Sequence, residues 1–459
     1  MKKKSIVALL LAAVMVAGSL VGCGGGDSSS GSSGSGSSGT EEAAGGEEQK
    51  QEPATLKTED VEASGEDVTL KVALWDYSNT DYYKTMISAF ENEYPNVTVE
   101  VVEFSADEYD NVVVTQLSGK ADFDVVFTKG TPALSALIGQ GHIYALDELI
   151  AADDAFDPAN YAGLVDQLGL GGHTYALPFR YDNNLIYYNK DLFDAAGVPY
   201  PEDGMSMEEY HELAKKLTSG EGSEKVFGTH VHTWTSNVYM YPDRTAEFNF
   251  VDPTTYESLI PYYNEILAMQ DEGIVQDYGA LKASNIHYSG VFYNQQAAML
   301  QIGTWYINML LENVDDFNWG VCSLPSNVGM GNENSIGGVT PVSIGAYSTH
   351  PAEAWQFIKY VCGEEGAKVL AATGIIPGYS SPAIGEIFDA IPQSYPNAPE
   401  GLSKYLSCEK FLVEQPMHEK GKEISTILDE EHSAIMTGSI SAEEGVQNMI
   451  DRVNEVIGQ

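Results

Sequence analysis

Residues 175–217 constrain the fold most, because they hold an extended run, an asparagine-rich turn, a second apolar run and a helix start without interruption. Pro178 fixes its own φ and biases Leu177 towards extended backbone, so the chain before it is predicted to be a strand. Ser206 stands three residues before Glu209, the spacing of a capping box, and apolar residues then recur at helical intervals. We therefore expect a strand, a turn and a second apolar run, followed by a helix capped by Ser206.

This stretch resembles a signature of the family 1 extracellular solute-binding proteins, the sugar-binding receptors of bacterial ABC importers. The signature combines a Tyr-Gly/Ala-Leu-Pro segment, an acid, a Tyr-Asn-Lys-Asp-Leu-Phe segment, a Gly-Val/Ile-Pro turn and a helix opened by Ser or Thr. The matching positions here are 175–178, Asp182, 188–193, 197–199 and Ser206. The resemblance covers residues 68–459. It implies that this stretch is the first crossover between two lobes, with the ligand bound in the cleft between them.

Strand and helix patterns alternate from residue 68 onwards, with strands expected at 68–74, 97–104 and 124–127. This rhythm favours α/β layers with substantially parallel sheets. The resemblance implies a two-lobed periplasmic-binding-protein-like fold of type II, in which each lobe has a mixed, mostly parallel sheet flanked by helices. It implies lobe 1 at 68–180 and 340–378, lobe 2 at 181–339 and 379–459, and a three-segment hinge near 179–183, 337–341 and 377–381.

The first residues are predicted to be a secretion signal. Three lysines precede an uncharged run at 5–20, which is shorter than the ~20 apolar residues of a bilayer span. Residues 1–22 therefore resemble a signal peptide, and residues 20–23 match a lipobox that places a lipid on Cys23. The alternative is a cysteine that merely follows an apolar segment.

Residues 23–67 are rich in Gly, Ser and Glu, with almost no large apolar side chains. Such a composition buries too little apolar area to offset the entropy of ordering, so we expect a disordered tether. The protein is then expected on the cell membrane, lipid-anchored and facing outside the cytoplasm.

Charge and cysteine content argue against several functions. The formal net charge of -44 disfavours nucleic acid and other polyanions as partners, although acidity can serve solubility alone. Beyond Cys23 there remain Cys322, Cys362 and Cys408, an odd number without CxxC spacing, so we expect core thiols and no zinc site. The sequence also lacks HExxH, P-loop and GxSxG motifs. We therefore expect a monomer without metal or cofactor, and not an enzyme.

A sugar site needs flat aromatic faces for the apolar side of the ring and planar polar groups for its hydroxyls. Trp75, Asp76 and Tyr77 follow the first expected strand, where the resemblance implies cleft loops. Trp75 can alternatively be a core aromatic, and Asp76 and Asn79 can cap the next helix. Lys129 follows the third expected strand and is a further candidate for a hydroxyl contact, with a solvated loop lysine as the alternative.

The expected crossovers supply three more candidates. Asp182 occupies the acid position of the signature, and Arg180 precedes it by two residues, so the two can bind ligand or form an ion pair with each other. Gly338 belongs to the glycine pair 337–338, which lets ligand or hinge backbone approach closely or is a plain loop.

Two tryptophans complete the candidate ligand-binding set. Trp234 is flanked by hydroxyl-bearing residues, which is unusual in a core strand. Trp305 lies in a segment that resembles the Gly-Ser/Thr-Trp element of the family. The resemblance implies that the ring faces the cleft, and Gly303 permits an unusual backbone conformation before it. For Trp305 the alternative is again a core position.

Together these features predict a carbohydrate-binding receptor that delivers a sugar or oligosaccharide to the permease subunits of an ABC transporter by cleft closure. One alternative is a lipid-anchored glycoside hydrolase, which needs a pair of carboxylates at the sugar. Another is a receptor of the same fold for a non-sugar such as a polyamine or peptide, whose cleft would hold more acids than aromatics.

Overall fold

The structure is a computed structural model that describes residues 55–56, 65–78, 80–284, 286–331, 333–405 and 410–458. The chain divides into two units, residues 1–51 and 52–459, and the following concerns the second. Cys23, the predicted signal peptide, Asn79 and Cys408 lie outside the described residues. Thr55, within the stretch expected to be a tether, forms a parallel bridge with Ala145, and the adjacent Leu56 is buried in the core.

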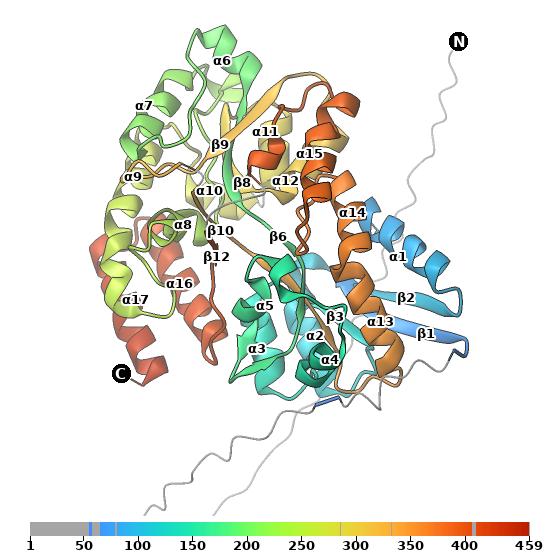
Figure 1. Cartoon of the computed structure of the whole chain (residues 1–459). Coiled ribbons are helices and arrows are strands. Elements are labelled where there is room, and N and C mark those ends of the chain that lie inside the picture. Colours follow the sequence, from blue (N-terminus) through green and yellow to red (C-terminus); the bar gives the residue numbers. More distant parts are fainter. Residues whose placement is uncertain are drawn as a thin grey trace, which may run out of the picture. The chain divides into compact units, whose positions relative to one another are not determined.

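A mixed five-stranded sheet forms the first layer of this unit (Figure 1). Its order is β2-β1-β3-β11-β6, where the first two pairings are parallel and the last two are antiparallel. The expected early strands are confirmed. The strands are β1 (Val68–Trp75), β2 (Val97–Phe104), β3 (Val125–Phe127), β6 (Leu177–Tyr181) and β11 (Val339–Ile344).

A second sheet of three strands has the order β8-β7-β9 and is entirely antiparallel. Its strands are β7 (Asn184–Asn189), β8 (Met299–Gly303) and β9 (Trp319–Ser323). The prediction of a mostly parallel sheet is wrong here. Strand direction depends on which strands pair, and β7 lies between β8 and β9 and runs opposite to both.

Two short pairs complete the strands. β10 (Asn334–Gly337) runs parallel to β12 (Lys410–Val413), and β4 (Gly169–Leu170) is antiparallel to β5 (His173–Thr174). The β10–β12 pair joins segments more than 70 residues apart, so it brings the chain around residue 414 beside the glycine pair at 337–338.

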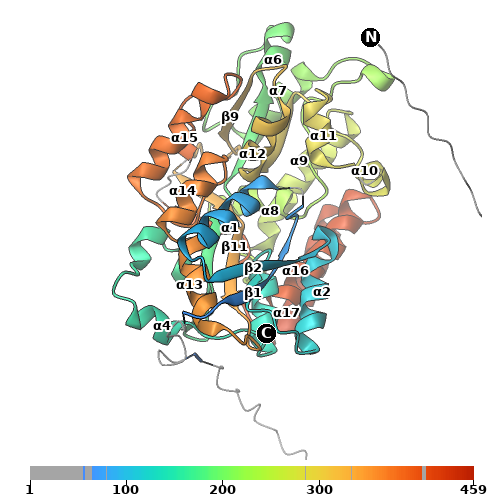
Figure 2. The same ribbon diagram turned by 90° about the vertical axis from the view of Figure 1, so that its right-hand side faces the viewer.

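Helices surround the two sheets (Figures 1 and 2). One apolar core contains residues of α1 (Asp81–Glu93), α2 (Tyr109–Ser118), α3 (Thr131–Gly139), α4 (Asp147–Ala152), α5 (Leu164–Gln167), α11 (Tyr288–Tyr293), α12 (Trp305–Asn313), α13 (Pro351–Cys362), α14 (Glu364–Ala372) and α15 (Pro382–Ser394). A second core contains residues of α6 (Lys190–Ala196), α7 (Met207–Leu217), α8 (Ser236–Arg244), α9 (Ile260–Asp271), α10 (Tyr278–Ser284), α16 (Gly421–Met436) and α17 (Ala442–Ile457).

Strand β7 contributes to both cores, because side chains alternate between the two faces of a strand. Leu185 and Tyr187 belong to the first core, and Ile186 and Tyr188 to the second. The apolar run that follows the asparagine-rich turn is therefore buried on both sides. This explains why its sequence shows no alternation between apolar and polar residues.

The capping box before α7 is confirmed. The Ser206 hydroxyl accepts a hydrogen bond from the Glu209 backbone N–H at 3.1 Å, and the Glu209 carboxylate accepts one from the Ser206 backbone N–H at 2.8 Å. Behind this cap, the apolar side of α7 packs into the second core through Met207, Tyr210 and Leu217. The cap and the packing together fix the start of the helix.

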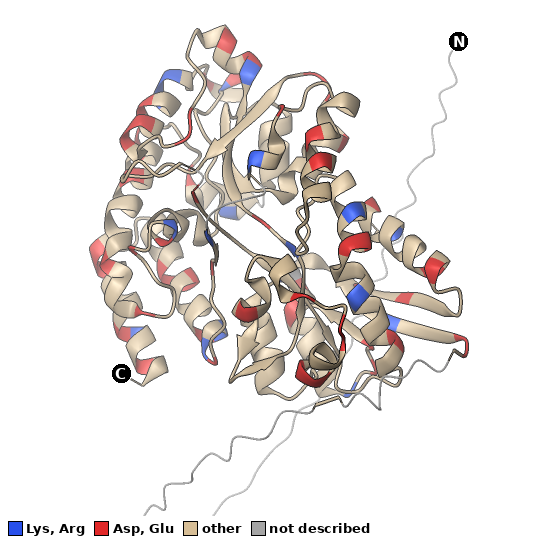
Figure 3. Cartoon of the chain, viewed as in Figure 1, with Lys and Arg blue, Asp and Glu red and all other residues tan. Residues whose placement is uncertain are grey.

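The described surface reflects the composition. Acidic side chains are spread over many of the helices and outnumber the basic ones (Figure 3). Cys322 and Cys362 are free and buried, as expected of core thiols. Within the described ranges, no helix is both long and apolar enough to cross a bilayer.

Candidate functional site

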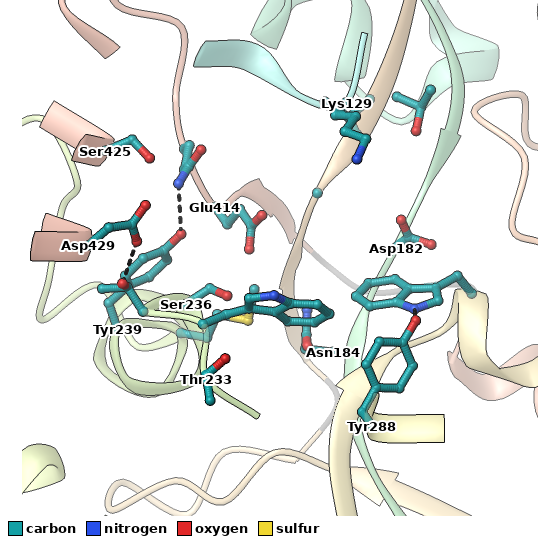
Figure 4. Close-up of a pocket in the computed structure, with 18 of the residues that line it drawn as sticks. Lys129, Asp182, Asn184, Thr233, Ser236, Tyr239, Tyr288, Glu414, Ser425 and Asp429 are labelled. Carbon is teal, nitrogen blue, oxygen red and sulfur yellow. Dashed lines mark hydrogen bonds between the residues drawn. The ribbon is translucent and has the colours of Figure 1, made fainter. Parts of the chain in front are cut away.

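A cavity of about 560 Å³ gathers almost all the predicted site residues (Figure 4). Its wall contains residues of both sheets, of the segments that connect them, and of α8, α10, α11 and α16. The predicted residues in the wall are Trp75, Asp76, Lys129, Arg180, Asp182, Trp234, Trp305 and Gly338. Tyr77 is the exception, because its partly buried ring packs against the first core.

Trp75 ends β1 and has two environments. Its ring packs against Tyr109 with centroids 4.9 Å apart, so part of the indole belongs to the core. The Lys129 ammonium lies 5.5 Å from the centroid of the Trp75 ring, within the range of a cation–π contact. Lys129 also donates a hydrogen bond to the Ala106 carbonyl, and its side chain is exposed, as the alternative of a solvated loop lysine requires.

Asp76 follows Trp75 in the left-handed region, with φ of 55°, where a non-glycine residue is uncommon. The Thr80 hydroxyl donates to the Asp76 carbonyl, and Thr80 is the N-cap residue of α1. No side chain caps α1 among the described residues, so the alternative role of Asp76 as a helix cap is wrong. The turn leaves the Asp76 side chain in the cavity wall.

Arg180 and Asp182 occupy the end of β6 and the residue after it. The Arg180 Nε donates a 3.2 Å hydrogen bond to the Thr340 hydroxyl on the neighbouring strand. Burial raises the pKa of Asp182, and the nearby Arg180 guanidinium opposes that shift in part. No ion pair of the described residues joins the two side chains, and Asp182 Oδ1 has no hydrogen-bond partner there.

Two tryptophans form an aromatic wall. The ring centroids of Trp234 and Trp305 are 6.0 Å apart with planes inclined by 54°. Trp305 Nε1 donates to the Tyr288 hydroxyl at 2.9 Å, which fixes the orientation of its indole. Trp234 is 38% exposed, a large value for so apolar a side chain.

Gly303 makes room for the Trp305 ring and does not provide the unusual backbone conformation that we expected. It does not have a positive φ, so no special backbone conformation is involved. A Cβ at Gly303 would lie only 1.7 Å from Cζ3 of Trp305, so the glycine leaves the space that the indole occupies.

The glycine pair allows backbones to approach closely. The Asp182 backbone N–H donates to the Gly338 carbonyl at 2.9 Å, and the Glu414 backbone N–H donates to the Gly337 carbonyl at 3.0 Å. A Cβ at Gly337 would lie 1.4 Å from the Asp182 carbonyl oxygen, so only glycine fits. The expectation of close hinge backbone at this pair is confirmed, and the plain-loop alternative is wrong for Gly337.

Sequence reasoning missed the wall formed by the C-terminal part of the chain. Glu414 and Gln415 follow β12, and the Gln415 amide donates to the Tyr239 hydroxyl at 3.1 Å. Burial, together with the neighbouring Asp182 carboxylate, raises the pKa of Glu414 to about 7. Nothing in the local sequence marks Glu414, because its position depends on the long-range pairing of β12 with β10.

Helix α16 contributes a polar stripe to the same wall. Ser425, Asp429, His432 and Ser433 follow the i, i+4, i+7, i+8 spacing of one helical face and all line the cavity. The Thr235 hydroxyl donates to the Asp429 carboxylate, which joins α16 to the loop that carries Trp234. The local sequence marks this stripe only weakly, because α16 also carries polar residues outside it, such as Lys422, Glu423 and Glu430.

Comparison with known proteins now identifies the family. The model of the bacterial extracellular solute-binding proteins matches residues 78–368, well over half of the chain. The chain belongs to this family. The cavity described above is therefore the cavity of a solute-binding protein.

The solute-binding protein is similar to several known proteins. It is 34% identical to a sugar transporter of Rhizobium etli in an open conformation, with a TM-score of 0.70 over 84% of this chain and 99% of the other. An ABC substrate-binding protein of Listeria monocytogenes in complex with cycloalternan has a TM-score of 0.73 at 22% identity, over 86% of this chain and 100% of the other. A binding protein of Brucella abortus (strain 2308) is 23% identical over 326 residues, 69% of this chain and 77% of its own length. These likenesses confirm the two-lobed α/β fold.

Proposed function

We propose that the protein is a receptor that binds a sugar or oligosaccharide in this cavity and delivers it to the permease subunits of an ABC importer. The observation that carries the proposal is the placement of Trp75, Trp234 and Trp305 around one cavity whose remaining wall is largely polar. A pyranose has an apolar face that packs on an indole and a rim of hydroxyls that needs hydrogen-bonding groups. Both requirements are met in the same space.

The known relatives support this choice of ligand. The Rhizobium etli neighbour is described as a sugar transporter, and the Listeria neighbour is bound to cycloalternan. We transfer the carbohydrate class to this chain because its cavity has the matching aromatic and polar groups. The particular sugar depends on the loops at Trp75, Trp234 and Lys129.

We also propose that ligand binding closes the cavity by a hinge motion at 179–183, 337–341 and 377–381. The Gly378 backbone N–H donates to the Phe179 carbonyl at 2.9 Å, and the Asp182 backbone N–H donates to the Gly338 carbonyl, so the three segments lie side by side where the chain passes between the two sheets. Closure should decrease the radius of gyration in solution scattering at saturating ligand. An unchanged radius of gyration would contradict the hinge.

Anchoring is a further part of the proposal. We infer that residues 1–22 are a signal peptide, that Cys23 carries a lipid, and that the receptor works as a monomer on the outer face of the cell membrane. A flexible chain of the length of residues 24–54 reaches roughly 30 Å, at ~5–6 Å times the square root of the residue number. This reach allows the binding unit to stand off the lipid surface while it stays near a permease.

A thermal-shift screen against mono- and oligosaccharides tests the function. We expect at least one neutral or aminated sugar to raise Tm of the wild type and of Tyr395→Ala, which removes an exposed aromatic outside the cavity. The same sugar should give a much smaller shift with Trp234→Ala. Prolonged incubation should release no new reducing ends, since we propose a receptor and not a glycoside hydrolase. Absence of any shift across the screen would overturn the proposal.

A further inference from the structure

Two acidic side chains lie on either side of the glycine pair. Asp182 and Glu414 are bonded through their backbone N–H groups to the consecutive carbonyls of Gly338 and Gly337. Both side chains line the cavity, and Figure 4 shows the two carboxylates on opposite sides of the segment that passes between them. The acids are therefore held at one place by three chain segments that are far apart in the sequence.

Neither acid is fully satisfied within the described part of the chain. Asp182 is only 7% exposed, and its Oδ1 has no hydrogen-bond partner there. Glu414 Oε2 is equally without a partner. A buried carboxylate is costly unless hydrogen bonds or a cation compensate its charge. Both residues line the cavity, so a ligand bound there lies beside two carboxylates that the described residues do not fully satisfy.

The charges around the pair are unequal. Asp182 has the Arg180 guanidinium close enough to favour its ionised form. The charged groups that act on Glu414, by contrast, are the carboxylates of Asp182 and Asp243. Lys129 and Lys282 also line the cavity, but Arg180 is the one cation among the causes that shift the pKa of either acid.

We propose that Asp182 and Glu414 form a subsite for a positively charged substituent, so that the sugar bound by this protein carries an ammonium group. This inference rests on the proposed carbohydrate receptor and specifies its ligand class. An ammonium group donates up to three hydrogen bonds and accepts none, so it suits a wall on which two carboxylates lack hydrogen-bond donors. An anionic sugar would bring a third negative charge and is expected to be rejected.

The aromatic wall explains why the cation belongs to a sugar and not to a free amine. The backbone N–H of Trp305 lowers the pKa of Asp182, so the acid lies beside the residue that carries one of the two neighbouring indoles. A ring packed on Trp305 would therefore have an edge substituent near Asp182. A linear polyamine would satisfy the acids but would leave the indole faces uncovered.

Calorimetric titrations of matched sugar pairs at pH 7 and low ionic strength test the subsite. The pairs are glucosamine and glucose, galactosamine and galactose, and mannosamine and mannose, which differ only by an ammonium or a hydroxyl at one carbon. We expect at least one aminated sugar to bind about tenfold more tightly than its partner, because a charge-assisted hydrogen bond is about twice as strong as a neutral one. Glucuronate and spermidine serve as the anionic sugar and the ring-free cation.

The variants Glu414→Gln and Glu386→Gln remove one negative charge each, from the cavity wall and from an exposed position of α15. The preference for the aminated sugar should fall below about twofold in Glu414→Gln and persist in Glu386→Gln. Equal or tighter binding of the neutral partner in every pair overturns the charged subsite and leaves the sugar receptor standing. Binding of spermidine without any sugar overturns both proposals, as does binding of no compound.

Discussion

The indole Nε1 of Trp305 donates a 2.9 Å hydrogen bond to the hydroxyl of Tyr288, which lies on a different helix of the cavity wall. This bond orients the ring whose face we assign to the sugar. Tyr288→Phe removes the acceptor and keeps the ring, so the indole should become less ordered. We expect affinity for the best sugar of the screen to fall about three- to tenfold, since one such bond contributes ~0.5–1.5 kcal/mol.

Titration calorimetry on Tyr288→Phe checks this, with Tyr395→Phe as the control at an exposed tyrosine outside the cavity. Unchanged affinity in both variants would show that the hydrogen bond between Trp305 and Tyr288 does not contribute to sugar binding.

The glycine pair offers a matched test of the crossover. In Gly337→Ala the new methyl would lie 1.4 Å from the Asp182 carbonyl oxygen, so the backbone must move. In Gly338→Ala the nearest atom is Glu414 Oε1 at 3.5 Å, an ordinary contact. We expect Gly337→Ala to lose ~1–3 kcal/mol or more of unfolding free energy, as overpacked sites do, and Gly338→Ala to lose far less. Denaturant unfolding of both variants measures the difference, and equal losses would contradict the observed backbone approach.

Glu414 makes ligand-free stability depend on pH. Its folded-state pKa of about 7 lies above the ordinary value of a glutamate, because burial and the nearby acid favour the protonated form. Its contribution to stability is therefore fully present below the unfolded-state pKa and is lost as the pH rises through 7. Glu414→Gln stays uncharged, so it should match wild-type Tm near pH 5 and exceed it near pH 8.

Thermal unfolding of wild type, Glu414→Gln and Glu386→Gln between pH 5 and 8 checks this sign. The difference cancels titrating groups that do not interact with Glu414. Asp243 does interact, since burial and Glu414 raise its pKa to about 8, so its pKa should fall in Glu414→Gln and add to the gain of the variant at high pH. A Tm difference that does not change with pH would mean that Glu414 stays ionised throughout.

Anchoring can be tested on the full chain. Cys23→Ala removes the residue to which we assign the lipid, so the protein should be released or misprocessed. Detergent phase partitioning and the mass of the mature protein distinguish the two forms, with Cys322→Ser as a cysteine control in the folded unit. A Cys23→Ala protein that still carried lipid would refute the lipobox.

Local patterns predicted much of the fold because their causes are local. The capping box at Ser206 follows from residues within one turn of chain. The strand expected before Pro178 instead runs from Leu177 to Tyr181, with the proline inside it. Strand direction in the three-stranded sheet did not follow, since the insertion of β7 between β8 and β9 is a long-range choice. The same reason separates Asp182, found from a local signature, from Glu414, which reaches the cavity through the pairing of β10 with β12.

Most of the predicted site residues line the cavity for a similar reason. Trp75 lies at a strand end and Asp182 at a crossover. Such positions lie close together when several strands end at the same cavity, so their sequence positions alone indicated the site. Tyr77 does not line the cavity. Two residues beyond a strand end, the direction of a side chain depends on the turn, and here Asp76 has a positive φ.

The central claim is that this cavity binds a sugar between an indole face and a carboxylate. Titration of the best sugar into Trp305→Ala and Asp182→Ala, with Tm of each ligand-free variant, tests it most directly. We predict that each variant loses roughly five- to 150-fold in affinity, equivalent to ~1–3 kcal/mol, while Tm stays close to wild type. A large fall in ligand-free Tm with unchanged affinity would contradict the claim and show that both residues have a structural role in the core.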